Sequence, residues 1–134
     1  MEARTPPGRD GFGDLIGLEY LELTPEQVRA RARVTDDLRQ PFGLVHGGVF
    51  ASMAESMCSR ATWMAVRAEG MAAMGQSNNA TFMRPITEGD IHATAHPRHR
   101  GRTTWVWDVE VNDDDGRLCG LARVTVAVRP IPSR

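Results

Sequence analysis

The segment that decides the fold runs from Gln40 to Ser59 and reads Gln-Pro-Phe-Gly-Leu-Val-His-Gly-Gly-Val-Phe-Ala-Ser-Met-Ala-Glu-Ser-Met-Cys-Ser. A loop rich in Pro and Gly ends at His46-Gly47-Gly48, and an apolar pattern with helical spacing then runs from Val49 to about Arg67. This pattern predicts the only long helix of the chain. We therefore expect the other elements to be arranged around it.

Two features of this segment suggest a functional site. Consecutive glycines let other atoms approach the backbone closely, and free N–H groups at a helix start favour negative charge, as in an oxyanion hole. Within the predicted helix, polar residues recur at helical spacing among apolar ones: Ser52, Glu55, Ser59 and Thr62. The alternatives are that the Gly pair only forms a tight turn and that Glu55 lies on a solvated face.

The spacing between Gly47 and Glu55 has a consequence for assembly. They are eight residues apart, and a helix rises ~1.5 Å per residue, so about 12 Å separates them along one helix. They cannot both contact one small reacting group within a single chain. If both take part in chemistry, the carboxylate must come from a second copy, and the site requires a homodimer.

A family resemblance appears in the same residues. Gln40 to Gly48, followed by Ala54-Glu55-Ser56, resembles the signature of hotdog-fold acyl-CoA thioesterases of the PaaI and 4-hydroxybenzoyl-CoA type. The similarity covers most of residues 14 to 129. It continues through Asn79-Ala80-Thr81, Arg84-Pro85-Ile86, Glu88-Gly89, Arg100-Gly101-Arg102 and Asp115-Gly116-Arg117. The resemblance implies a hotdog fold of the α+β class, with an antiparallel sheet of five to six strands wrapped around one long central helix.

The resemblance also implies an activity and a set of roles. The chain would hydrolyse an acyl-CoA or aroyl-CoA thioester, with coenzyme A as part of the substrate and no cofactor. The N–H of Gly47 would hold the oxyanion, and the partner subunit's Glu55 would act as nucleophile or general base. His46 and Gln40 would orient the carbonyl or a water, and Ser59 would position the nucleophile. The alternatives are loop hydrogen bonds for Gln40 and His46 and an ordinary helix hydroxyl for Ser59.

Substrate contacts are implied more broadly. The basic segment from Arg98 to Thr104 suits phosphate, and in the resembling family this loop lies near the pantetheine and nucleotide of coenzyme A. An ordinary basic turn is the alternative. The implied substrate and coenzyme A contacts are Gly48, Asn79, Phe82, Met83, Arg84, Arg100, Arg102, Thr103 and Thr104. Phe82-Met83 stand where one branch of the family carries a His pair, so we expect a more apolar acyl pocket here.

Composition limits the other classes of function. The 134 residues carry a formal net charge of −1, which gives no general attraction to nucleic acid or an anionic membrane. Two cysteines, Cys58 and Cys119, do not make a disulfide-stapled domain, and no run of 18 apolar residues occurs, so we expect a cytoplasmic protein. Residues 1–13 read as a flexible leader and residues 14–134 as one hotdog thioesterase domain.

The remaining pattern is mostly β. Leu15 to Leu23 reads as a short helical turn leading into a strand, and Asp113 to Gly116 reads as a hairpin turn. Further strands are expected at residues 27–34, 73–83, 90–97, 103–112 and 117–128. Arg29, Arg31 and Arg33 would share the outer face of their strand and pair with acidic neighbours.

Other residues of the chain suggest functions different from thioester hydrolysis. His92, His96 and His99 suggest a metal, but they lack the ligand set and spacing of a zinc site, and we expect none. Cys58 lies on the apolar helix face, where an inert thiol is expected. A hotdog dehydratase or hydratase and a non-catalytic acyl-CoA-binding module stay open as alternatives. Sheet edges and the shared site favour dimers, and because relatives commonly pair dimers, a homotetramer is expected.

Overall fold

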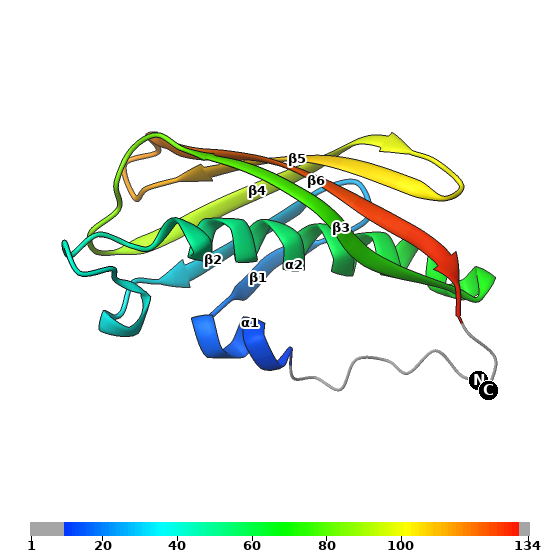
Figure 1. The fold of residues 1–134 in the computed structure, drawn as a ribbon, viewed down its shortest axis with the longest axis horizontal. Coiled ribbons are helices and arrows are strands. Elements are labelled where there is room, and N and C mark those ends of the chain that lie inside the picture. The colour runs from blue at the N-terminus through cyan, green and yellow to red at the C-terminus, as the bar shows by residue number, and fades with distance from the viewer. Residues whose placement is uncertain (1–9, 132–134) are drawn as a thin grey trace.

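The computed structural model describes residues 10–131, which form one antiparallel sheet curved around one long helix (Figure 1). The helices and strands are α1 (Gly11–Ile16), β1 (Glu19–Leu23), β2 (Val28–Arg33), α2 (Gly47–Val66), β3 (Met71–Phe82), β4 (Asp90–Arg100), β5 (Thr104–Asn112) and β6 (Leu118–Pro130). There are also two short 3-10 helices, at Asp36–Leu38 and Arg67–Glu69.

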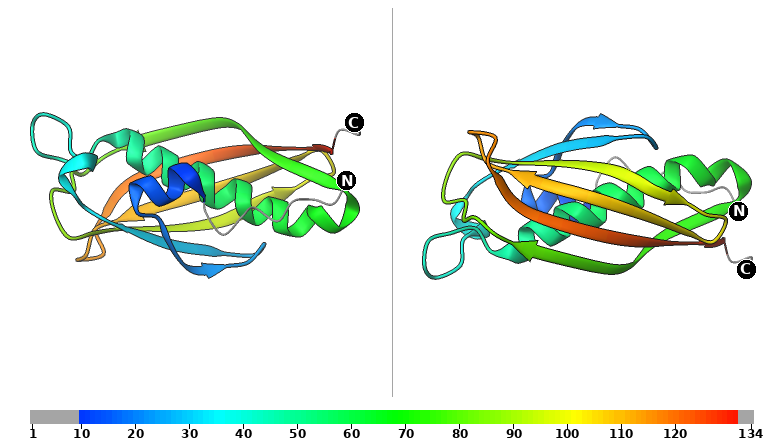
Figure 2. Two further views of the ribbon diagram at one scale, coloured as in Figure 1. Left: turned by 90° about the horizontal axis from the view of Figure 1, so that it is seen from below. Right: turned by 90° about the horizontal axis from the view of Figure 1, so that it is seen from above.

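The sheet has the strand order β1-β2-β4-β5-β6-β3, with every neighbouring pair antiparallel. Its concave face packs on α2, and α1 lies on the side of α2 away from the sheet (Figures 1 and 2). This is the hotdog arrangement that the resemblance implied. Strand β3 pairs only with β6 and therefore forms one edge of the sheet. An edge strand has a row of backbone N–H and C=O groups that no neighbouring strand of the same chain pairs.

The core is built from the alternating inner faces of the strands and most of α2. In β5, Trp105, Trp107, Val109 and Val111 point inward, as the alternation in the sequence predicts. The apolar side of α2 meets them with Met53, Met57 and other fully buried residues. Burial of these side chains is the main favourable free energy of folding, at roughly 25 cal/mol per Å² of apolar surface.

The ends of the long helix match their sequence signals. The N-cap is His46, whose Nδ1 accepts a hydrogen bond from the N–H of Gly48 at 2.9 Å. Gly70 ends the following 3-10 turn in the left-handed conformation, at φ 74°. The helix begins at Gly47, two residues before the first apolar residue of the pattern, so both glycines belong to its first turn.

The structure agrees with one local prediction and differs from two others. The outer arginines of β2 do pair with acidic neighbours, for example Arg31 with Glu19 at 3.2 Å. The boundary expected at residue 13 falls inside α1, which begins at Gly11, while residues 1–9 of the expected leader lie outside the described residues. Thr62 was assigned to the polar stripe of the helix, but it is fully buried and accepts a hydrogen bond from Trp107 Nε1 at 2.9 Å.

In residues 10–131 no helix combines the length and apolar character needed to cross a membrane.

Candidate active site

The start of α2 presents an unoccupied hydrogen-bond donor. The N–H of Gly48 is taken by His46 Nδ1 and that of Val49 by the carbonyl of His46, both at 2.9 Å. The N–H of Gly47 donates to no acceptor among the described residues. It therefore lies at the positive end of a 20-residue helix dipole, available to an incoming oxygen.

Phe82, at the end of β3, covers Gly47. A Cβ built on Gly47 would lie 2.8 Å from Phe82 Cζ and closer still to two other ring carbons. The ring also meets Phe50 edge-on, with centroids 6.0 Å apart. Position 47 therefore accommodates only glycine while Phe82 keeps this place.

Gln40 shapes the loop that leads to the helix. Its Oε1 accepts a short hydrogen bond from the N–H of Phe42, and its own N–H donates to the carbonyl of Leu44 at 2.8 Å. Gly43 completes the turn with φ 90°, a conformation that favours glycine. Gln40 and His46 thus have the loop-structuring contacts that sequence analysis gave as the alternative to a catalytic role.

Glu55 lies away from Gly47, farther along α2. Its side chain is exposed and lies against Gly75 of β3, where a Cβ would be 2.8 Å from Glu55 Cγ and 2.9 Å from both Cδ and Oε1. Within one chain, the carboxylate and the Gly47 N–H therefore belong to separate surroundings, one beside Gly75 and the other beside Phe82. This agrees with the separation that the sequence spacing predicts.

Ser59 differs from Ser52 and Thr62, two other hydroxyl residues of α2. Ser52 and Thr62 each donate to the carbonyl four residues earlier, at 2.7 Å. Ser59 Oγ is buried and has no hydrogen-bond partner among the described residues. A buried hydroxyl without a partner costs free energy, and a functional role is one of the explanations for such a group.

A cavity of about 570 Å³ adjoins the helix start, between α1 and the loop before α2. Its apolar walls come from Phe12, Leu15, Ile16, Leu38 and Val49. Its polar and charged lining comes from Asp37, Arg39, His46, Gly48 and Ser52. This cavity could not be predicted from the sequence, because it depends on how α1 packs on α2.

The comparisons with known proteins agree with this architecture. A family model described as the Thioesterase superfamily matches residues 42–120, which include most of the loop before α2, the whole of α2, strands β3 to β5 and the start of β6. The chain belongs to the thioesterase superfamily.

Individual relatives of this superfamily member cover nearly its whole length. The proofreading thioesterase EntH of Klebsiella pneumoniae is 36% identical over 113 residues, which are 84% of this chain and 82% of that protein. A mutant of thioesterase PA1618 from Pseudomonas aeruginosa superposes with a TM-score of 0.86 at 36% identity, covering 91% of this chain and 88% of that chain. Thioesterase HI1161 from Haemophilus influenzae has a TM-score of 0.86 at 29% identity, covering 93% of this chain and 87% of that chain.

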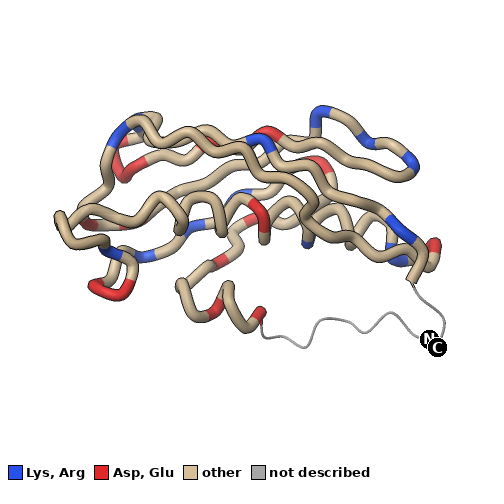
Figure 3. Tube along the Cα trace, in the orientation of Figure 1, with Lys and Arg blue, Asp and Glu red and all other residues tan. Residues whose placement is uncertain are grey.

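The arginine-rich turn of this thioesterase lies at the other end of the helix. Arg100 and Arg102 line a cavity of about 550 Å³ together with Val66, the last residue of α2, and Glu69 in the 3-10 turn that follows. Figure 3 shows basic positions along the β4–β5 loop at that end of the molecule. Arg100 lies over the ring of Trp105, 5.4 Å from its centroid. Within one protomer, this turn is therefore remote from Gly47.

The other expected contact residues are spread over several places. Asn79 points to the outer face of the sheet, where it lines a shallow cavity with Thr81 and Arg123. Met83 and Arg84 are exposed just after β3, and their N–H groups both donate to the carbonyl of Cys119. Thr103 and Thr104 use their carbonyls within the arginine-rich turn, as acceptors for Val128 and Gly101. Of the expected substrate contacts, Gly48 follows Gly47 in the first turn of α2, and Phe82 packs against Gly47.

Two of the histidines that suggested a metal, His92 and His96, lie on β4 and contact different partners. His96 Nε2 lies 2.7 Å from Gln27 Oε1, whereas His92 Nε2 lies 2.8 Å from Asp114 Oδ1. The hydrogen bond from His92 lowers the pKa of Asp114. Asp90 completes a group whose potential ligand atoms lie within 4.8 Å of one another. The sequence did not predict that two carboxylates would lie beside His92, because Asp114 belongs to the β5–β6 hairpin, 22 residues later in the chain.

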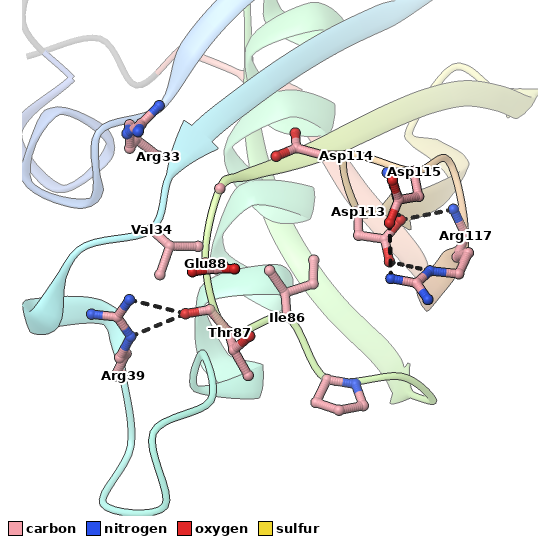
Figure 4. A pocket seen from close by; sticks show the side chains of 12 residues that line it. Arg33, Val34, Arg39, Ile86, Thr87, Glu88, Asp113, Asp114, Asp115 and Arg117 are labelled. Carbon is pink, nitrogen blue, oxygen red and sulfur yellow. Dashed lines mark hydrogen bonds and ion pairs between the residues drawn. The ribbon is translucent and has the colours of Figure 1, made fainter.

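That hairpin forms one wall of a charged cavity of about 580 Å³ (Figure 4). Its charged groups are largely paired within the protein. Arg117 contacts Asp113 at 2.8 Å and Asp115 at 3.1 Å, while Arg39 donates to the carbonyl of Thr87. We therefore assign the chemistry to α2 and not to this cavity.

Two residues that contact the candidate site were not predicted from the sequence. Gly75 leaves room for Glu55, and Asn78 donates from Nδ2 to the carbonyl of Ala51 in α2 at 2.8 Å. A signal existed for both. Glycine inside a strand often marks a bulge or a close approach, and a polar residue on the inner side of a strand needs a buried partner.

Proposed function

We propose that this thioesterase hydrolyses acyl-CoA thioesters in a site shared between two copies of the chain. The N–H of Gly47 holds the oxyanion that develops on the thioester carbonyl. The partner subunit's Glu55 either attacks the carbonyl carbon or removes a proton from an attacking water. In both routes the carbon–sulfur bond breaks, and coenzyme A leaves as a thiol after taking up a proton. In the first route water then hydrolyses the anhydride formed between Glu55 and the acyl group, which releases the carboxylic acid and regenerates Glu55.

One geometric relationship carries this proposal. Helix α2 and strand β3 run in opposite directions, and the hydrogen bond between Asn78 and Ala51 joins them midway. Gly47 and Glu55 lie four residues on either side of Ala51. At one end Phe82 covers Gly47, and at the other Gly75 lies against Glu55. A two-fold axis at this midpoint would place Gly47 of one protomer opposite Glu55 of the other.

The edge strand supports such a pairing. β3 is 12 residues long and lies at the edge of the sheet, whereas the opposite edge, β1, has only five residues. Met74 and Phe82 are apolar residues of β3 that are 50% and 52% exposed. A long edge with exposed apolar side chains favours pairing with another strand, here the β3 of a second copy.

The free donor explains how the site would lower the barrier. Gly47 N–H has no competing acceptor among the described residues, so it is already oriented before substrate binds. A preorganised donor of this kind contributes on the order of 3 kcal/mol to transition-state stabilisation. Ser59, one turn after Glu55 and with its Oγ unpartnered, is suited to hold the nucleophile in place.

The same two-fold axis would bring the partner's arginine-rich turn toward the helix start of the first protomer. Val66 lies 15 residues beyond Ala51, so the end of the partner's α2 would project about 16 Å past Gly47. Arg100 and Arg102 line the cavity at that end of the helix. We therefore assign the phosphates of coenzyme A to the partner's turn and the thioester to the first protomer's helix start. Phe82 and Met83 would give the acyl side an apolar surface.

Two further parts of the proposal concern the whole protein. Cys58 and Cys119 are both free and buried, which suits a reducing compartment, and we propose the cytoplasm. We also propose that two dimers pair into a homotetramer, which light scattering of the purified protein would test.

The main test follows free thiol release from a panel of acyl-CoAs. Glu55→Ala should lower turnover by orders of magnitude while the oligomer stays intact, and Glu55→Gln should do the same. Wild-type rates in either variant would reject the role of Glu55. Binding of acyl-CoA without thiol release by the wild-type protein would instead favour a non-catalytic module.

A mixing experiment tests whether the site is shared. Glu55→Ala and Gly47→Ala chains, each with strongly reduced thiol release alone, would form a heterodimer with one intact site after subunit exchange. Thiol release should then recover well above that of either variant. If exchange is demonstrated by mass spectrometry and no activity returns, the two residues act within the same chain.

A further inference from the structure

We infer that β3 positions the Glu55 carboxylate through two residues, Gly75 and Asn78. Gly75 gives the carboxylate its place, and Asn78 holds the helical turn from which Glu55 projects. Neither residue touches the substrate in this scheme; both act through Glu55. The inference rests on the proposed function and names the groups that make its carboxylate effective.

Gly75 provides space that any other residue would fill. Three atoms of the Glu55 side chain, Cγ, Cδ and Oε1, lie 2.8 to 2.9 Å from where a Cβ would be at position 75. Real Cβ atoms do not approach other atoms so closely, so an alanine there would push the carboxylate aside. Because the group that must move is the end of an exposed, flexible side chain, the fold itself should tolerate this change.

The strand is irregular at the same point. The pairing of β3 with β6 shifts register between Gly75 and Ser77, which leaves one extra residue, Gln76, in β3. Such bulges bend a strand and redirect its side chains. The bulge places Gly75 against Glu55 and turns Asn78 toward α2.

Asn78 fixes the helix to the strand one turn before Glu55. Its Nδ2 donates to the carbonyl of Ala51 at 2.8 Å, a contact between residues 27 positions apart. In an α-helix this carbonyl is also the acceptor for the N–H of Glu55. The amide of Asn78 therefore restrains the turn that carries Glu55. Its Oδ1 is buried and has no hydrogen-bond partner among the described residues, a cost that a purely structural asparagine would not need to bear.

The Asn78 and Gly75 contacts restrain Glu55 along two different directions. The Asn78 amide sets how close the helix lies to β3, and Gly75 sets where the carboxylate lies along the strand. Misplacement of a reacting group by about 1 Å can cost about 100-fold in rate. Loss of either contact should therefore lower kcat while substrate binding stays nearly the same.

Gly75→Ala is the first test. The added methyl group should lower kcat for thiol release at least about tenfold and leave KM within about twofold. The midpoint of thermal unfolding and the oligomeric state should not change. Gly11→Ala is the matched control, since a Cβ at Gly11 meets nothing within 4 Å, and it should retain wild-type kcat. A Gly75→Ala protein with wild-type kcat overturns the role of Gly75.

Asn78→Ala is the second test and should also lower kcat with little effect on KM. Asn112→Ala is its matched control, because Asn112 also donates from Nδ2 to a backbone carbonyl, that of Gly116 at 3.2 Å, but in the distant hairpin. In the Glu55→Ala background, neither Gly75→Ala nor Asn78→Ala should lower the residual rate further. Equal losses with and without Glu55 overturn the inference.

The outcomes separate the two proposals. If Glu55→Ala retains wild-type thiol release, the proposed function fails. If Glu55→Ala is inactive while Gly75→Ala and Asn78→Ala keep wild-type kcat, the function stands and only the positioning role fails.

Discussion

The ring of Phe82 lies over Gly47, so that the last residue of β3 closes the start of α2. This contact joins a strand end to a helix start 35 residues earlier in the chain. It leaves the Gly47 N–H beside an aromatic wall, in surroundings drier than open water. A hydrogen bond to a developing oxyanion is stronger in such surroundings.

Gly47→Ala should reduce thiol release at least about tenfold, equivalent to about 1.4 kcal/mol of transition-state free energy. The reason is steric, since the new Cβ overlaps the Phe82 ring and either the ring or the helix start must move. Combining it with Phe82→Leu should restore part of the lost rate, because the smaller side chain makes room. Phe82→Leu alone is the control, and strictly additive effects in the double-mutant cycle would contradict the steric explanation.

Thr62→Val should destabilise the fold by about 1 to 3 kcal/mol. The substitution keeps the shape of the side chain but removes the acceptor of the buried Trp107 Nε1–H, which then has no partner. Chemical denaturation followed by tryptophan fluorescence measures the change. Thr125→Val on β6 is the matched control. No hydrogen bond of the Thr125 side chain occurs within residues 10–131, and its substitution should change stability by less than about 0.5 kcal/mol.

Cys58 should be unreactive toward thiol reagents in the native protein. Burial raises the pKa of its thiol, which keeps the nucleophilic thiolate from forming, and the sulfur lies under the sheet. Iodoacetamide followed by mass spectrometry should show no alkylation of Cys58 at pH 8 until denaturant is added. Rapid modification of the folded protein would mean that α2 separates readily from the sheet.

Tyr20, the single tyrosine, should titrate late. Burial raises its pKa to about 12, although the nearby Arg60 guanidinium opposes part of this effect. Tyrosinate absorbance of the folded protein should therefore rise only near pH 12, whereas the chain unfolded in denaturant should titrate near about 10. Since the unfolded chain loses this proton first, Tyr20 should contribute to a fall in stability as the pH rises from about 10 to about 12. A native titration near pH 10 would show that Tyr20 is hydrated.

The fold was predictable because the two periodicities of the chain are clear. The alternation from Trp105 to Val111 can bury one face only as a strand, and the pattern after Gly48 can bury a face only as a helix. Local signals also placed the turns, at Gly70 and at the Asp113–Gly116 hairpin. These signals act over a few residues, so they can be read without knowledge of the tertiary structure.

Where tertiary packing competes with local pattern, sequence reasoning was less successful. Helix α1 begins at Gly11 within a stretch that its glycines mark as irregular, and its packing on α2 outweighs that weak propensity. Thr62 has the spacing of the polar stripe, but the indole of Trp107 requires an acceptor inside the core. In both cases the deciding partner lies far away in the sequence.

The chain by itself determined a helix that begins at a Gly pair, a carboxylate two turns farther along, and a sheet able to enclose that helix. Periodicity, capping and glycine chemistry specify these features locally. Only the tertiary structure decided that Phe82 covers Gly47, that Gly75 makes space for Glu55 and that Asn78 ties β3 to α2. Those contacts arise because β3, the edge strand, runs antiparallel to α2 and packs against it. No local pattern encodes which residues of two distant segments meet.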